Sequence, residues 1–146
     1  MLAALIGIAL AGGDWTPTPD EQKLVQALSS HDGPPSCDDL DAMVDDPVAS
    51  LERVVEHVTM PPWAGMSAAR CLIVNHPQSA EPTISQWMDD PEKLGLAKLV
   101  LLSVDQLPEP MALDVARVAL RGPHAVEARK RLPQSTRPAV RALVTP

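Results

Sequence analysis

A series of prolines at nearly constant spacing constrains the fold of this chain more than any other feature. The series consists of Pro47, Pro62, Pro77, Pro91, Pro108, Pro123 and Pro138. Proline is accepted in the first turn of a helix and excluded from its interior, so the spacing predicts helix boundaries. Each interval has room for a helix of about 11 residues and a short turn. Two such helices make a unit of about 30 residues, which is the period of an α-helical solenoid.

The apolar residues favour helices over strands. The 146 residues include no Phe, no Tyr and three Trp, so Ala, Leu, Val, Ile and Met supply most of the apolar side chains. A β-sandwich core normally draws on aromatic and β-branched residues. We therefore expect an all-α protein.

Apolar spacing predicts where the individual helices lie. Helices are expected over residues 20–30 and 38–45, and a third begins at Pro47. Apolar residues in this third helix recur at i, i+3, i+4 and i+7, which is the helical period. Helix pairs are then expected over residues 63–90 and 92–122, and a last pair over 123–132 and 135–144.

A common register relates three of the predicted helices. Pro82, Pro110 and Pro138 are equally spaced along the chain, each in the first turn of the second helix of a pair. The residue two positions after each proline is apolar: Ile84, Ala112 and Val140. The equal spacing, which we call the proline register, indicates a structural repeat, since equivalent positions of a repeat carry equivalent contacts.

Two fragments resemble HEAT-type repeats, namely residues 67–72 (SAARCL) and 126–132 (VEARKRL). Each has a small or apolar pair followed by a basic residue, and Pro91 and Pro123 open units much as the proline of that family does. The resemblance covers residues 36–146. It implies a right-handed α–α solenoid of about four helix pairs and a role in protein–protein association.

The net charge of −7 is unevenly distributed along the chain. Residues 1–60 carry 11 acidic and 2 basic side chains, residues 61–116 carry 7 and 3, and residues 117–146 carry 1 and 7. One interpretation is that these are solvated faces. The other is an oriented charged surface, either for a charged partner or for head-to-tail contact between copies.

Residues 1–13 have the pattern of a signal peptide. Leu2 to Ala11 is a short apolar run, and Ala9-Leu10-Ala11 has the small-x-small form that signal peptidase cleaves. The run is too short to span a membrane, which takes about 20 residues. No Lys or Arg precedes it, and the alternative is a first buried helix. We expect export to the periplasm or the outside, with residues 14–35 forming an N-terminal helix and linker.

Cys37 and Cys71 are the two cysteines of the chain. In an oxidising compartment, two cysteines predict one disulfide, which would close a loop of about 35 residues. The alternative is two buried free thiols that behave as small apolar side chains.

The sequence offers no pattern for catalysis or for a cofactor. None of its four histidines stands in a zinc-binding arrangement, and the acidic residues near position 40 lack the glycine and the terminal glutamate of an EF-hand. The basic C-terminal residues have no interleaved aromatic platforms, as nucleic-acid binding would require. We therefore expect no catalytic residues, no metal, no cofactor, no nucleic-acid partner and no stable membrane span in the mature chain.

Candidate binding residues are one tryptophan and a group of cations. Trp87 lies on an apolar stripe and is expected in the core. Trp63 follows two prolines, where it is either partly exposed, as binding residues often are, or packed under the loop. The cations are Arg129, Lys130, Arg131, Arg137 and Arg141. The expected function is a protein-interaction module without catalysis. The alternatives are head-to-tail self-association between the acidic and basic ends and, third, an accessory subunit of an enzyme.

Overall fold

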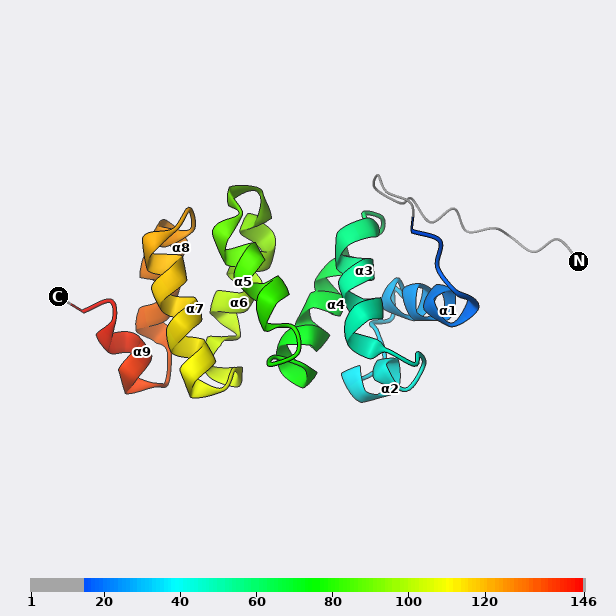
Figure 1. Ribbon diagram of the computed structural model, residues 1–146, viewed down its shortest axis with the longest axis horizontal. Coiled ribbons are helices and arrows are strands. Elements are labelled where there is room, and N and C mark those ends of the chain that lie inside the picture. The colour runs from blue at the N-terminus through cyan, green and yellow to red at the C-terminus, as the bar shows by residue number, and fades with distance from the viewer. Residues whose placement is uncertain (1–14, 146) are drawn as a thin grey trace, which may run out of the picture. The chain divides into compact units, whose positions relative to one another are not determined.

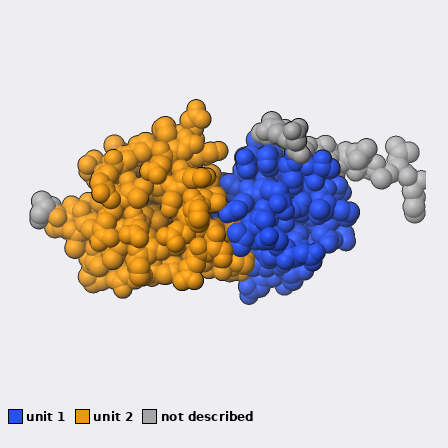
Figure 2. All heavy atoms as spheres, in the orientation of Figure 1, with its two compact units in different colours: residues 1–69 blue, residues 70–146 orange. Residues whose placement is uncertain are grey.

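The computed structural model describes residues 15–145, and every regular element among them is helical (Figure 1). This confirms the expected all-α class. The described residues form two compact units, 15–69 and 70–145, whose boundary lies within one helix (Figure 2). The division expected at residue 36 falls inside the first unit. The predicted signal peptide, residues 1–13, lies outside the described residues.

The first unit contains α1 (Pro19–Leu28), α2 (Cys37–Asp41), α3 (Pro47–His57) and the start of α4 (Pro62–Asn75). The helix predicted over 38–45 is shorter than expected. Residues 42–46 turn instead, because the Asp46 carboxylate accepts a hydrogen bond from Ala49 N and so caps α3. The core consists of fully buried aliphatic side chains: Leu24, Val25, Leu28, Leu40, Leu51 and Val54.

The second unit arranges its helices in two rows. In one row α7 (Glu109–Arg121) contacts both α5 (Glu81–Asp89) and α9 (Pro138–Ala142), and in the other α6 (Leu94–Leu102) contacts α8 (Ala125–Arg131). Contacts of α5 with α6 and of α7 with α8 join the rows. Each helix thus packs on its neighbour in sequence or on the next but one, so the contacts stay local along the chain.

Of the evenly spaced prolines, Pro77, Pro91, Pro108 and Pro123 lie outside the α-helices, whereas six prolines of the chain stand in the first turn of an α-helix. They occupy the first helical position of four helices and the second position of two: Pro19, Pro47, Pro62 and Pro138, then Pro82 and Pro110. These positions need no backbone N–H, because the first four amides of a helix have no intrahelical acceptor. The three prolines of the proline register stand in the first turns of α5, α7 and α9, as predicted. The apolar residues that follow them are fully buried: Ile84, Ala112 and Val140.

Candidate functional site

Three exposed apolar side chains lie at intervals of three residues, one just before α4 and two in its first turns. Their exposed fractions are 58% for Met60, 40% for Trp63 and 37% for Met66. The spacing of three residues keeps Trp63 and Met66 on neighbouring turns of one side of the helix. The ring of His31, from the loop after α1, lies 5.2 Å from the Trp63 ring at 53°. We call Met60, Trp63, Met66 and His31 the Trp63 patch.

The chemistry of the Trp63 patch suits contact with another molecule. Single exposed apolar residues are ordinary, but tryptophan is enriched among residues that dominate binding, and methionine adapts its shape to a partner. Trp87, by contrast, is only 5% exposed and forms part of the core, as predicted. The chain therefore buries one of these two tryptophans and leaves the other at the surface.

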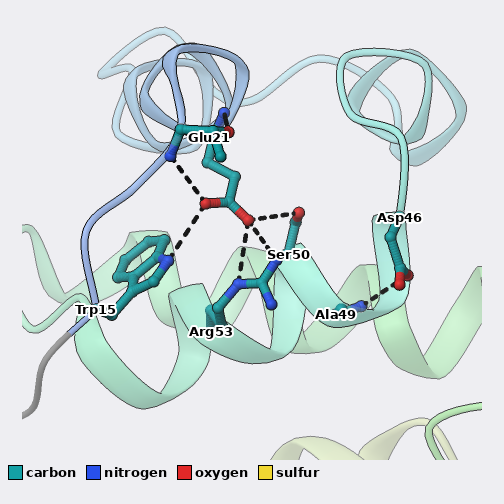
Figure 3. A network of polar contacts seen from close by, with 7 residues as sticks. Trp15, Glu21, Asp46, Ala49, Ser50 and Arg53 are labelled. Atoms are coloured by element: carbon teal, nitrogen blue, oxygen red, sulfur yellow. Dashed lines mark hydrogen bonds and ion pairs between the residues drawn. The ribbon is translucent and has the colours of Figure 1, made fainter.

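A buried carboxylate joins α1 to α3 in the first unit (Figure 3). Glu21, on α1, is 3% exposed. Its Oε2 accepts hydrogen bonds from Trp15 Nε1 at 3.2 Å and from Thr18 N at 3.0 Å. Its Oε1 accepts from Ser50 Oγ at 2.9 Å and from Arg53 Nε at 3.0 Å, both on α3. Glu21 thus links the start of α1 to the middle of α3.

The electrostatics of this cluster keep Glu21 ionised. Burial raises the pKa of Glu21, but hydrogen bonds from Arg53, Thr18 and Ser50, together with the charge of Arg53, outweigh burial and lower it below its ordinary value. Trp15 also stacks on His57 at the end of α3, with 5.5 Å between ring centroids and 27° between planes. The cluster therefore has a structural role: it fixes α3, which runs into the turn before the Trp63 patch.

Sequence reasoning did not identify the pair of Glu21 and Arg53. Two signals were present. Thr18-Pro19-Asp20-Glu21 has the spacing of a capping box, and both of its reciprocal hydrogen bonds form. Arg53 is one of only two cations in residues 1–69, so an acidic partner was to be expected.

Some of the predicted binding cations pair with one carboxylate in the second unit. Glu127 lies on α8. Its Oε1 is 3.9 Å from Lys98 Nζ on α6 and 3.7 Å from Lys130 Nζ, and its Oε2 is 3.5 Å from Arg131 Nε. Arg129 is exposed and has no ion pair among residues 15–145. Lys98, Lys130 and Arg131 thus share the negative charge of Glu127, whereas Arg129 has no acidic partner among residues 15–145.

The other two predicted cations shape the loop before α9. Arg137 Nη2 donates to the carbonyl of Asp105 at 2.9 Å, and Arg141 Nη1 donates to the carbonyl of Ser135 at 2.7 Å. The Asp105 carboxylate accepts from Ser135 Oγ and, at 2.8 Å, from Thr136 N. The structure therefore divides the predicted group of cations, since part of it holds this loop and part lies on α8.

The described residues can be compared with the requirements of a metal site, a small-molecule pocket and a membrane span. Residues 15–145 contain no group of three His, Cys, Asp or Glu side chains able to hold a metal ion. A pocket of about 200 Å³ near the C-terminus is smaller than the usual small-molecule site. Its lining is Pro133, Arg141, Val144 and Thr145. None of the described helices has the length and apolar character needed to cross a bilayer.

The two cysteines are joined. Cys37 begins α2 and Cys71 lies within α4. Both are disulfide-bonded and neither is a free thiol, so the expected disulfide is present. It closes a loop of about 35 residues.

No protein-family model, curated protein or solved structure matches this chain. A HEAT-like relationship therefore has only the residues of this chain to support it.

Proposed function

We propose that this chain is a protein-interaction module without catalysis, and that the Trp63 patch is its binding surface. The observation that supports this proposal most directly is that Trp63 is exposed between two exposed methionines, whereas Trp87 is buried. Removing such apolar surface from water contributes about 25 cal/mol per Å² to association. Large side chains with a rigid ring lose little entropy when they are bound, which makes Trp63 the anchor of the contact.

The module is a right-handed, HEAT-like array of stacked helix pairs. Two observations support this proposal. Helices two apart in sequence pack together in two rows, α5 with α7 and α9, and α6 with α8. The proline register places equivalent prolines at the starts of one row. Repeats that contact only their neighbours form a stable platform for an extended binding surface.

Binding fits the polar clusters better than catalysis does. A general acid or base must lie within hydrogen-bond distance of the substrate, and its pKa must be near the pH at which the enzyme works. The carboxylates of Glu21, which is buried, and Asp105, which is half-buried, are engaged by hydrogen-bond donors within the fold, and both pKa values are lowered. Their arrangement supports a structural role in a rigid scaffold.

The module acts outside the cytoplasm, in the periplasm or beyond the cell. The apolar run from Leu2 to Ala11 and the disulfide support this proposal. Intact mass of the protein from its native host, with and without thiol alkylation, tests it. The expected chain begins near Gly12 and carries two unreactive sulfurs. A full-length chain with two alkylated thiols would overturn it.

The interaction itself is tested by the native mass of the protein in extracts of its host. We expect the wild-type chain in a complex heavier than its monomer and Trp63→Ser at the monomer mass. Val74→Ser is the matched control, since Val74 lies on the same helix and is also 40% exposed. The proposal fails if all three proteins migrate alike.

A further inference from the structure

A second exposed apolar surface lies on α6 and α8 of the second unit. Leu102 on α6 and Val126 on α8 are 61% and 65% exposed, and Leu94 on α6 is exposed as well. Leu94, Lys98 and Leu102 follow one another at intervals of four residues, which keeps them on one side of α6. We define the α6–α8 face by six residues: Leu94, Lys98, Leu102, Val126, Arg129 and Lys130.

The contributions of the two helices adjoin at one carboxylate oxygen. Val126, Arg129 and Lys130 stand at i, i+3 and i+4 and are all exposed, so they lie on one side of α8. Glu127 Oε1 is within 4 Å of the ammonium groups of both Lys98 and Lys130. Because α6 also packs on α8, the cations of both helices and their exposed aliphatic side chains belong to one surface.

This surface is positive where it meets solvent. Among the residues of α6 and α8, four are basic and Glu127 is the one acidic residue. The Glu127 side chain is only 15% exposed, and three cations pair with it. Arg129 is exposed and has no ion pair among residues 15–145. Glu92 and Lys93, which precede α6, cancel each other in charge. The face therefore complements a partner with negative charges around an apolar region.

The residue types of the face favour a lipid bilayer over a protein as that partner. Neither α6 nor α8 contains an aromatic residue, and leucine and valine are under-represented among the residues that dominate protein–protein binding. Exposed leucine beside lysine and arginine is typical of helices that lie in a membrane interface. There the aliphatic side chains enter the acyl region, and the long cationic side chains extend to the head groups. Positive charge selects anionic head groups.

We propose that the α6–α8 face docks on the surface of an anionic lipid bilayer. Its three aliphatic side chains enter the boundary between head groups and acyl chains, and its three cations contact the lipid phosphates. The acidic surplus of the chain lies outside the second unit, since residues 70–146 carry 10 basic and 8 acidic side chains. The contact does not involve the Trp63 patch, which stays available to a protein partner.

Sedimentation of the purified chain with lipid vesicles tests this contact. The probes are vesicles of phosphatidylcholine alone and vesicles of equal parts phosphatidylcholine and phosphatidylglycerol. We expect the wild type to sediment with the mixed vesicles and to remain in the supernatant with phosphatidylcholine. In about 1 M salt, where the screening length is about 3 Å, most of the bound protein should be released.

Two variants separate the charged part of the contact from the apolar part. Arg129→Gln removes one exposed cation and should weaken binding to the mixed vesicles about fivefold. Leu102→Ser keeps every cation and should weaken it about tenfold, because an aliphatic side chain no longer leaves water. Arg117→Gln, at an exposed position of α7 in the other row, and Trp63→Ser are the controls. Both should bind as the wild type does, and circular dichroism verifies that every variant is folded.

A wild type that remains in the supernatant with the mixed vesicles overturns the inference, and so does equal binding to both kinds of vesicle. Unchanged binding of Arg129→Gln or Leu102→Ser overturns it as well, because the contact is then elsewhere. Loss of binding in Trp63→Ser would move the contact to the Trp63 patch and refute the assignment to α6 and α8. Binding of polyglutamate without binding of mixed vesicles would replace the bilayer by an acidic protein. None of these outcomes alters the test of the proposed function, which does not use lipid.

Discussion

Ser50 Oγ donates a 2.9 Å hydrogen bond to Glu21 Oε1, and the two residues are 29 positions apart on different helices. Both are buried, so the bond forms away from water. Arg53, one turn further along α3, adds a charge-assisted bond to the same oxygen. This contact joins α1 to α3 in the unit that carries the Trp63 patch.

Replacing Glu21 should destabilise the chain more than replacing its neutral partner. Glu21→Ala is expected to lower the free energy of unfolding by about 2–3 kcal/mol, because Ser50 then lacks its acceptor in a buried site. Ser50→Ala should cost about 1 kcal/mol, since Arg53 continues to satisfy the carboxylate. Urea unfolding monitored by circular dichroism measures both. Equal losses in the two variants would show that the carboxylate is not the centre of the cluster.

Stability should decrease in acid. Burial raises the pKa of Asp105, but hydrogen bonds from Ser135 and Thr136 and the charge of Arg137 lower it overall. The pKa of Glu21 is lowered in the same way by its own contacts. A lowered pKa in the folded state means that the unfolded chain binds protons first, so stability is full above the ordinary values of 4.5 and 3.8. It is lost as the pH falls through the lowered values.

The measurement is the midpoint of thermal unfolding from neutral pH down to about pH 3. The midpoint should fall with pH in the wild type. Glu21→Gln should be less stable at neutral pH and show a shallower fall, because its side chain cannot take up the proton. An unchanged slope in this variant would contradict the role assigned to Glu21.

Reduction of the disulfide should destabilise the chain. In the loop-entropy account, a closed loop of about 35 residues contributes roughly 3–4 kcal/mol. The variant with Cys37→Ser and Cys71→Ser should unfold at a correspondingly lower urea concentration. Reductant should lower the stability of the wild type to that of this variant and leave the variant unchanged. A wild type indifferent to reductant would refute the prediction.

Substitution of Trp87 should lower stability, whereas substitution of Trp63 should leave stability nearly unchanged. Trp87→Ala opens a cavity in the core and should cost about 3–5 kcal/mol. Trp63→Ala removes an exposed ring and should change stability by less than about 1 kcal/mol. Unfolding curves of the two variants check this directly. Similar losses would mean that the Trp63 ring packs as part of the core.

Local patterns in the sequence predicted the all-α class and the starts of several helices. Proline in a first turn is a property of neighbouring residues alone, so Pro82, Pro110 and Pro138 predicted three helix starts of one row. The end of α2 at Asp41 was missed, because an aspartate that caps the next helix resembles one that continues the present helix.

Contacts between distant residues could not be predicted in the same way. Asp105 and Ser135 are 30 positions apart, and no periodic pattern relates them. For the same reason Arg137 looks like a surface cation in the sequence, although it donates to the carbonyl of Asp105. Exposure of Trp63 was one of the two alternatives suggested by its place after two prolines, but its contact with His31 was not expected.

Site-specific photo-cross-linking in the native host tests the interaction surface most directly. A photoreactive amino acid replaces Trp63 in one strain and the equally exposed Val74 in another. We predict a discrete cross-linked protein product at position 63, identified by mass spectrometry, and a much weaker one at position 74. Absence of a product at position 63, or equal products at both positions, would contradict the account of this chain as an interaction module centred on Trp63.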